Sequence, residues 1–383
     1  MIPLADCLNI EDLRTRARRA LPRPIFSYMD GGAESQWTMA RNTSGFDDVA
    51  IIPRVLKDVS APDTRVTVLG AKLAWPLICA PTGASRFYHP EGEGAVARAA
   101  ASSGVLYSLS TMATASLEEV ARIGAAPKLF QLYVFKDRGV TRALIERAKA
   151  AGYCGLCLTV DAAARGKREA ELRSGMGIPL RLKSSGYLSF AMHPGWLLGQ
   201  VRKGPMAMAN FSAFTGRDDI VEHAKFVGAQ LDASVTWKDI DQFAALWDGP
   251  MALKGVVHTD DAQAAMGSGA TALIVSNHGG RQLDGSVAAI DALPAIVEAA
   301  GEKLEIILDG GIRRGVHIRK ALGLGAKACM IGRPYLYGLA AGGEAGVARA
   351  LAILSEEFVS AMRLTGCAEL DSISAGDMRS RRG

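Results

Sequence analysis

The chain has 383 residues, of which 49% are hydrophobic and 22% charged, and its formal net charge is +5. This length allows one large domain or two medium ones, and the composition is that of an ordinary soluble globular protein. The charge is modest and no run of lysine and arginine is interleaved with aromatics, which argues against nucleic-acid binding. A basic balance suits an anionic substrate, a phosphate-bearing cofactor or an anionic membrane face. No apolar run reaches 18 residues and no apolar core follows a basic start, so we expect a cytoplasmic protein without a signal peptide or spanning segment.

Cysteine spacing gives no sign of a metal or redox site. Six cysteines are scattered along the chain, and only Cys154 and Cys157 form a C-x-x-C pair. That pair lies in the apolar run 153–160, which is typical of a buried strand. Because no second pair offers metal-ligand spacing, we expect packed thiols in a reducing compartment and no metal site.

In chain order, residues 1–70 predict a helical N-terminal extension with a short pair of strands. Eight short apolar runs then alternate with alanine-rich amphipathic segments. The predicted strands are 76–80, 105–109, 128–133, 155–161, 251–256, 272–276, 304–309 and 328–332. The predicted helices between them are 91–103, 116–123, 138–151, 260–268, 292–300 and 315–324. Strand–helix units in this order predict an α/β fold, a closed parallel (β/α)8 TIM barrel. An open doubly wound sheet competes, but no G-x-G-x-x-G follows the first strand.

A long insertion, residues 165–240, separates the fourth and fifth predicted strands. It must emerge at the carboxyl end of the barrel, where active sites lie, so we expect a lid or a docking element. Aromatic and apolar side chains gather in it at Tyr187, Phe190, Met192, Trp196, Leu197 and Leu198, and cations flank them at Lys183, Arg202 and Lys203. Such a segment either lies in a membrane interface or packs on its own protein or on a neighbouring subunit. We expect residues 1–383 to form a single domain.

The most informative motif follows the sixth predicted strand, in residues 276–285. It contains His278, Arg281 and three glycines. An imidazole can take a proton near neutral pH, and an arginine three residues further on can hold a carboxylate through two parallel hydrogen bonds. The glycines let the backbone approach a flat ligand and adopt positive φ. The motif therefore indicates a base beside an anion clamp, which suits chemistry on an acid substrate.

The exits of the other strands carry further polar groups. Glycine-rich turns at 309–315 and 331–334, after the seventh and eighth strands, match the phosphate site of many barrels. Asp309 is placed to accept hydrogen bonds from cofactor hydroxyls. Lys254, at the end of the fifth strand, would be a fixed positive charge that favours a ring system becoming anionic on reduction. Together these features predict a pocket for flavin mononucleotide (FMN).

In the order of these motifs the chain resembles the FMN-dependent α-hydroxy acid dehydrogenase/oxidase family, which includes glycolate oxidase, L-lactate dehydrogenase and mandelate dehydrogenase. The segments that carry the resemblance cover almost the whole chain and are specific jointly rather than singly. They are 26–28, 80–83, 130–133, 158–161, 166–169, 237–239, 254–255, 276–284, 309–315 and 331–334. The resemblance implies FMN-dependent oxidation of an L-2-hydroxy acid, mandelate- or lactate-like, to the 2-oxo acid.

The resemblance also implies a role for each residue of the site. His278 would be the base, Asp161 would stabilise the imidazolium, and Tyr133 would bond the substrate hydroxyl. Lys254 would support the reduced, anionic flavin. The substrate carboxylate would be held by Tyr28, Arg168 and Arg281. The cofactor would be bound by Pro81, Thr82, Gly83, Ser110, Gln131, Thr159, Lys254, Ser276, Asp309, Gly310, Gly311, Arg313, Gly332 and Arg333.

Several alternatives stay open at this stage. The substrate's α-hydrogen leaves either as a proton to His278 or as hydride to the flavin, in which case His278 removes the hydroxyl proton. Taken alone, Asp161 is more typical of a strand-end turn, Arg168 suits a solvated helix face, and Arg333 suits a salt bridge. We expect the other histidines to be structural: His89, His193, His223, His258 and His317.

The insertion and segment 193–196 look more like the bacterial membrane-associated lactate and mandelate dehydrogenases than the soluble oxidases. Gly83 stands where many oxidases carry Ala, and Met112 where glycolate oxidase has Trp, which leaves room for a larger substrate group. The resemblance thus favours transfer of electrons to a quinone or similar acceptor, a homotetramer, and a peripheral place on the inner face of the cytoplasmic membrane. Alternatives are the same oxidation with O2, giving hydrogen peroxide, and a non-redox FMN barrel such as an isomerase.

Overall fold

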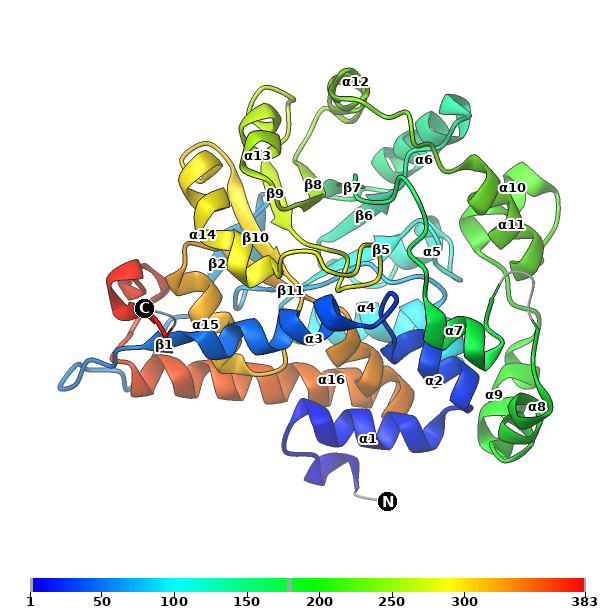
Figure 1. The fold of residues 1–383 in the computed structure, drawn as a ribbon, viewed down its shortest axis with the longest axis horizontal. Helices are drawn as coiled ribbons and strands as arrows, with labels where there is room; N and C mark the ends of the chain where they lie inside the picture. Colours follow the sequence, from blue (N-terminus) through cyan, green and yellow to red (C-terminus); the bar gives the residue numbers. More distant parts are fainter. Residues whose placement is uncertain (1–2, 178–180, 382–383) are drawn as a thin grey trace.

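A closed barrel of eight parallel strands forms the centre of the protein (Figure 1). The computed structural model describes residues 3–177 and 181–381, so small parts of the predicted extension and insertion lie outside the described residues. The barrel strands are β4 Leu77–Cys79, β5 Leu106–Ser110, β6 Lys128–Leu132, β7 Gly155–Thr159, β8 Met251–Val256, β9 Ala272–Val275, β10 Glu305–Asp309 and β11 Ala328–Ile331. They follow each other in chain order, and β11 pairs back with β4. The predicted (β/α)8 barrel is confirmed.

Helices surround this barrel, one after each strand. They are α4 Gly92–Ser102, α5 Leu117–Ala121, α6 Arg138–Ala150, α12 Trp237–Trp247, α13 Thr259–Ala265, α14 Ala289–Ala300, α15 Gly315–Gly323 and α16 Arg333–Leu364. Local sequence sets their starts. Ser116 and Glu119 form a reciprocal cap at the start of α5, and at the start of α12 Asp239 Oδ2 accepts from the backbone N–H of Thr236 at 2.9 Å. Because α12 begins at Trp237, residue 240, the predicted end of the insertion, lies in its first turn.

Apolar side chains fill the barrel on both faces of its strands. Alternate residues such as Ile78 and Leu106 point inward, where they meet a hairpin formed by β2 Val66–Val68 and β3 Ala71–Leu73. The hairpin carries Leu69 and Leu73, both buried, into the same inner cluster. Each fully buried Leu or Ile contributes roughly 1.5–3 kcal/mol. Burial on both faces explains why these strands read as continuous apolar runs.

The N-terminal extension packs across the outside of the barrel. It consists of α1 Ile10–Ala20, α2 Arg23–Asp30, α3 Trp37–Ser44 and the short strand β1 Val49–Ile51. Helix α1 lies against α16, and β1 pairs antiparallel with a C-terminal strand, β12 Met378–Ser380, which the sequence did not predict. Short 3-10 turns complete the chain at Leu4–Asp6, Gly45–Asp48, Ser85–Phe87, Ala209–Phe211, Leu370–Ser372 and Ala375–Asp377. The extension places the end of α2 at the barrel mouth.

The insertion after β7 forms short helices along one side of the barrel mouth (Figure 1). They are α7 Glu169–Ser174, α8 Ser184–Ala191, α9 Pro194–Lys203, α10 Ser212–Thr215 and α11 Ile220–Gln230. Helix α9 is fastened to the loop after β4: Trp196 Nε1 donates to the carbonyl of Phe87 at 2.8 Å, and Gln200 Nε2 to that of Arg86 at 2.6 Å. The Arg86 side chain in turn donates to the carbonyl of Gly204. These bonds hold α9 in place on the barrel.

Most of the cysteines and two of the remaining histidines, His223 and His317, are buried. All six cysteines are free, and burial raises the pKa of the Cys157 thiol to about 12. His223 is fully buried and accepts from the Met208 backbone at 3.0 Å. His317 stacks on Phe46, with ring centroids 4.3 Å apart. A neutral thiol is a poor nucleophile and a poor metal ligand, so Cys157 is suited to packing.

Candidate active site

The carboxyl ends of the barrel strands open into a cavity of about 460 Å³. In parallel barrels this end carries the loops that build active sites. All the predicted substrate residues line the cavity: Tyr28, Tyr133, Arg168, His278 and Arg281. All the predicted cofactor residues line it as well, except Ser276, which is fully buried behind the wall. The fold therefore gathers at one cavity side chains that are far apart in the sequence.

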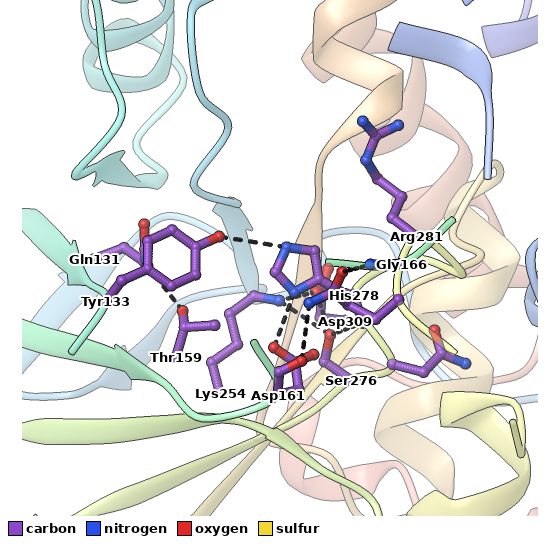
Figure 2. A network of polar contacts seen from close by, with 12 residues as sticks. Gln131, Tyr133, Thr159, Asp161, Gly166, Lys254, Ser276, His278, Arg281 and Asp309 are labelled. Carbon is purple, nitrogen blue, oxygen red and sulfur yellow. Dashed lines mark hydrogen bonds and ion pairs between the residues drawn. The ribbon is translucent and has the colours of Figure 1, made fainter. Parts of the chain in front are cut away.

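Lys254, on β8, is a buried cation at the floor of this cavity. Its Nζ donates to Asp309 Oδ2 at 2.6 Å and to Ser276 Oγ at 3.0 Å, as Figure 2 shows. Burial alone would lower the pKa of Lys254, but the attraction of Asp309 and Asp161 outweighs it and raises the pKa above its ordinary value. The ammonium is therefore a permanent positive charge. Asp309, predicted to accept from cofactor hydroxyls, has one oxygen already engaged by Lys254 and Ser276.

Neighbouring strands β5, β6 and β7 contribute a second polar group. The Gln131 carboxamide donates through Nε2 to Thr159 Oγ1 at 2.9 Å and accepts at Oε1 from Ser110 Oγ at 3.2 Å. Oε1 also accepts from the backbone N–H of Thr111 at 3.4 Å, so both ends of the amide are fixed and its remaining N–H has a defined direction. A fixed amide N–H donor matches the C=O groups along the edge of a flavin's pyrimidine ring.

His278 sits on a strained turn directly after β9. Its φ is 58°, a left-handed value that is rare for a residue with a side chain, and its backbone N–H donates to Ser276 Oγ at 3.0 Å. The turn leaves the imidazole lining the cavity, with Nδ1 2.9 Å from Asp161 Oδ1 and Nε2 3.5 Å from Tyr133 Oη (Figure 2). Strain of this kind persists only where the surroundings enforce it, and it concentrates at functional sites.

Asp161 lies behind His278 at the exit of β7 rather than on the cavity wall. Burial raises the pKa of Asp161, but the charges of His278 and Lys254 outweigh burial, so its pKa lies below the ordinary value. The ionised carboxylate holds the Nδ1–H, which leaves the lone pair of the imidazole on Nε2. Gly255 permits the approach: an added Cβ there would stand 2.6 Å from Asp161 Cβ. Beside them, burial raises the pKa of Tyr133 to about 12, so its hydroxyl keeps its proton.

Glycine turns after β10 and β11 form the other end of the cavity. Gly310 and Gly311 have φ of 118° and 77°, and an added Cβ at Gly311 would stand only 1.8 Å from the carbonyl oxygen of Asn42. Arg333 donates to the carbonyls of Gly279 and Gly31, while its buried Nε has no partner. Burial lowers the pKa of Arg333 to about 10, which a nearby anion would reverse. This end is suited to a phosphate group.

The predicted carboxylate clamp is more elaborate than the sequence suggested. Arg281 Nη1 donates to the carbonyls of Tyr28 at 2.9 Å and Gly31 at 2.8 Å, and the guanidinium lies over the Tyr28 ring, 5.4 Å from its centroid. Arg168 Nε donates to the backbone carbonyl of Arg281 at 3.2 Å. The two arginines thus lie side by side on the cavity wall. Arg281 Nη2 also donates to Glu171 at 2.7 Å, a partner that the sequence did not predict.

Sequence reasoning missed several other wall residues. Tyr88, in the loop after β4, lines the cavity, as do Met208, Ala224 and Val227 from the insertion. No strand-exit pattern marks them, because they come from irregular loops and from helix α11. The one available signal was the presence of a long insertion at the barrel mouth, which says where a wall lies but not which residues form it.

Taken together, these groups fit FMN. A fixed cation and an amide edge suit the polar part of a flavin ring, and the partnerless Arg333 Nε beside the glycine turns suits its phosphate. Cationic arginines and a base occupy the remaining side of the cavity, where a small acid would fit. The cavity therefore has room and donors for both a cofactor and a substrate.

Comparison with known proteins agrees with this geometry. Residues 17–380 match the model of the FMN-dependent dehydrogenase family. The chain is 42% identical to an L-lactate oxidase of Nostoc sp., across 97% of this chain and 98% of that protein, and 42% identical to an L-lactate dehydrogenase of Caulobacter sp., across 94% and 96%. The crystal structure of the monotopic membrane protein (S)-mandelate dehydrogenase is similar too, with 35% identity, a TM-score of 0.94 and coverage of 98% of this chain and 100% of that chain. The chain belongs to the FMN-dependent dehydrogenase family, and FMN is its cofactor.

Proposed function

We propose that this protein oxidises an L-2-hydroxy acid to the 2-oxo acid, with His278 as the base. The observation that carries the proposal is the Asp161–His278 pair, whose Nε2 lies 3.5 Å from Tyr133 Oη in a cavity that also holds Arg168 and Arg281. Base and cations are the two things an α-hydroxy carboxylate requires. FMN, when bound, accepts the two electrons that leave the substrate. Relatives named L-lactate oxidase, glycolate oxidase and L-lactate dehydrogenase support this substrate class.

The chain's own groups have separable tasks in this proposal. His278 takes a proton at Nε2, and Asp161, ionised by its lowered pKa, stabilises the imidazolium that forms. Because the pKa of Tyr133 is about 12, its hydroxyl keeps its proton and donates to the substrate oxygen. Arg168 and Arg281 hold the carboxylate through charge-assisted hydrogen bonds, which are about twice as strong as neutral ones. The buried Lys254 favours negative charge at the cavity floor.

Apolar side chains in the cavity wall favour a substrate with a sizeable apolar group. Met208, Ala224 and Val227 present small or flexible apolar side chains. On the other side, an added Cβ at Gly83 would stand 3.1 Å from Met112 Cβ, so the glycine leaves space beside that methionine. An apolar pocket of this kind favours aromatic or longer aliphatic 2-hydroxy acids, mandelate or lactate homologues, over glycolate.

For the electron acceptor, we propose a quinone or a similar compound rather than O2. The support is a surface formed by α8 and α9, which we call the α8–α9 surface. Its exposed apolar residues are Tyr187, Leu188, Met192, Leu198 and Val201. Cations lie at its edges, at Lys183, Arg202 and Lys203. An apolar face rimmed by cations suits contact with the interface of an anionic membrane, where quinones dissolve.

Not all the apolar residues that the sequence places in this segment belong to the α8–α9 surface. Phe190 and Trp196 turn inward and pack on each other, with ring centroids 5.4 Å apart, while Leu188 and Val201 are exposed instead. No helix in the described parts of the chain has both the length and the apolar character needed to cross a bilayer. The similarity to a monotopic membrane protein, (S)-mandelate dehydrogenase, supports contact through this surface, in line with the predicted inner face of the cytoplasmic membrane.

The membrane proposal is tested by flotation with vesicles that contain anionic lipid. A Leu188→Asp, Met192→Asp variant should lose vesicle binding while its stability changes by about 0.5 kcal/mol or less, because both side chains are exposed. Trp237→Asp, which alters an exposed aromatic residue outside this surface, is the control. Binding that persists in the double variant would contradict the membrane proposal.

The base is tested by rapid mixing of the anaerobic holoenzyme with L-lactate or L-mandelate. His278→Gln should slow bleaching of the flavin absorbance by about 10²–10⁴-fold, the usual contribution of a general base. Flavin content should be unchanged, because His278 is not one of the residues expected to bind the cofactor. Bleaching at the wild-type rate would remove His278 from the role of base. No bleaching of the wild-type protein by any 2-hydroxy acid would favour the non-redox alternative, an isomerase.

The acceptor is tested by exposing the reduced protein either to air or to a soluble quinone analogue. We expect fast reoxidation by the quinone and slow reoxidation by air. Fast and complete reoxidation by air, with stoichiometric hydrogen peroxide, would instead make the protein a 2-hydroxy acid oxidase. The expected homotetramer is tested separately by sedimentation, and a monomer at micromolar concentration would overturn it.

A further inference from the structure

Glu171 is a buried carboxylate placed among arginines of the substrate side. It lies on α7, at the start of the insertion, and only 1% of its surface is exposed. Its Oε1 lies 2.7 Å from Arg281 Nη2 and 3.7 Å from Arg168 Nη1, and its Oε2 lies 3.4 Å from Arg165 Nη2. A carboxylate buried this deeply is stable only when cations compensate it. Three cations face one anion, so the cluster keeps a positive excess.

The bonds of Arg281 show what this carboxylate does to the clamp. Nη1 is held by the carbonyls of Tyr28 and Gly31, and Nη2 is held by Glu171. No described residue accepts a hydrogen bond from Nε of Arg281, and Arg281 lines the cavity. The guanidinium is therefore anchored along one edge, while Nε remains for a ligand. In Figure 2 the Arg281 side chain extends away from the His278 imidazole. The contacts that hold Arg281 therefore set where a substrate carboxylate binds relative to the base.

Arg168 shows that the cluster can take one more anion. Burial, followed by repulsion from Arg281, lowers the pKa of Arg168 to about 10, although Glu171 acts in the opposite direction. A guanidinium with a lowered pKa is an undercompensated cation, and a bound carboxylate would relieve it. Glu171 thus neutralises part of the cluster and leaves charge for a single substrate carboxylate.

We propose that Glu171 is a positioning residue for the carboxylate clamp. It fixes Arg281 beside Arg168 so that both face the substrate, and because it belongs to α7, it makes the clamp depend on how the insertion docks. This inference rests on the proposed oxidation of a 2-hydroxy acid. Two other roles make different predictions: a competitor that occupies Arg281 until substrate displaces it, and a salt bridge that only stabilises the fold.

The test compares charged and neutral forms of one ligand on the FMN-loaded protein. Phenylacetate and methyl phenylacetate lack the 2-hydroxyl, so their dissociation constants follow from the perturbation of flavin absorbance without turnover. Glu171→Gln should weaken phenylacetate about tenfold and leave the ester unchanged, while Glu171→Asp keeps the charge and should recover most of the affinity. With L-mandelate, KM should rise about tenfold and kcat should change less than threefold.

The pairing with Arg281 is tested by a double-mutant cycle. In an Arg281→Lys background, Glu171→Gln should have almost no further effect on phenylacetate, because the group it positions is gone. If Glu171→Gln alone folds poorly, Glu171→Gln with Arg165→Gln restores the charge balance at the half-exposed Arg165, and the selective loss for the acid should remain.

Each contrary outcome identifies the role that is wrong. Tighter phenylacetate binding by Glu171→Gln would make Glu171 a competitor, and equal losses for acid and ester would make it a structural salt bridge. Either result overturns the positioning role. The binding measurements do not depend on oxidation, so a failure of the proposed function, seen as an unbleached wild-type flavin, is distinguishable from a failure of this inference.

Discussion

The floor and the rim of the cavity are built in different ways. The floor consists of strand ends: Lys254 on β8 pairs at 2.6 Å with Asp309 on β10, and Gln131 on β6 bonds Thr159 on β7. The rim consists of added segments: α2 brings Tyr28, and the insertion brings Glu171 and the wall of α11. The floor is a closed network inside a barrel whose strands pack on both faces. The rim is held by hydrogen bonds and ion pairs between segments that are not part of the eight-stranded barrel.

The floor groups therefore serve the chemical step, and the rim groups serve recognition of the substrate. Groups that must keep a fixed charge or tautomer, such as Lys254 and the Asp161–His278 pair, stand on or directly after strands whose position the core fixes. Groups that select the substrate stand on segments that can vary without disturbing that core. Changes to the floor should therefore cost both stability and function, and changes to the apolar wall that α11 contributes to the rim should alter substrate choice with little loss of stability.

The largest effect should come from breaking the floor. Lys254→Met leaves Asp309 buried without its cation, which should destabilise the protein by about 3–5 kcal/mol and reduce FMN retention. The measurement is urea unfolding together with flavin content after gel filtration. The exposed Lys238→Met is the matched control and should change neither. A Lys254→Met protein as stable as the wild type would show that the floor network is not a stabilising unit.

Removing the carboxylate behind the base should come next. Asp161→Asn keeps the shape but removes the charge that stabilises the imidazolium, so flavin reduction by L-mandelate should slow about 10²-fold. Binding of phenylacetate should stay within about twofold, because Asp161 does not line the cavity. The measurement is single-turnover absorbance with the dissociation constant determined in parallel. A loss of binding as large as the loss of rate would mean that Asp161 acts on the substrate and not through His278.

A smaller effect should appear in the dependence of stability on pH. Burial, with Lys320 nearby, lowers the pKa of His317 to about 4, against an unfolded value of about 6.5. The unfolded state therefore binds more protons between these values, so His317 makes stability fall as pH falls from about 6.5 through 4, by about 1–3 kcal/mol. His317→Asn should flatten this part of the unfolding profile. An unchanged slope in urea titrations at pH 4 to 7 would refute the assignment.

The smallest effect should come from reshaping the rim. Ala224→Phe fills the wall that α11 presents to the cavity and should raise KM for L-mandelate about tenfold while sparing L-lactate. Ala229→Phe, on the exposed face of the same helix, is the control. Equal effects of the two substitutions on both substrates would show that α11 does not determine substrate size.

Much of the floor was predictable from the sequence, and the reason is physical. A strand buried on both faces must be a continuous apolar run, so the eight strands could be located and the polar residue near or just after the end of each one stood out. His278, Lys254 and Asp309 could be found in this way. The pairing of Lys254 with Asp309 could not, because it depends on the closure of the barrel.

The rim was less predictable, for the opposite reason. Glu171 lies in an ordinary charged helix turn, 110 residues before Arg281, and only the docking of α7 makes it buried. Likewise, the sequence left open whether Phe190 and Trp196 lie at the surface or pack inward, because composition does not tell which face of α8 or α9 turns inward. The pairing of β1 with β12 joins segments at opposite ends of the chain and carries no local signal.

The central claim is that base, clamp and FMN form one site for 2-hydroxy acids. The most direct test is an anaerobic titration of the FMN-loaded protein with L-lactate, L-mandelate and their D-enantiomers, followed by flavin absorbance. We expect stoichiometric bleaching by at least one L-acid, none by the D-acids, and none on the same timescale in His278→Gln. A flavin that stays oxidised with every acid, or equal bleaching in His278→Gln, would contradict the account.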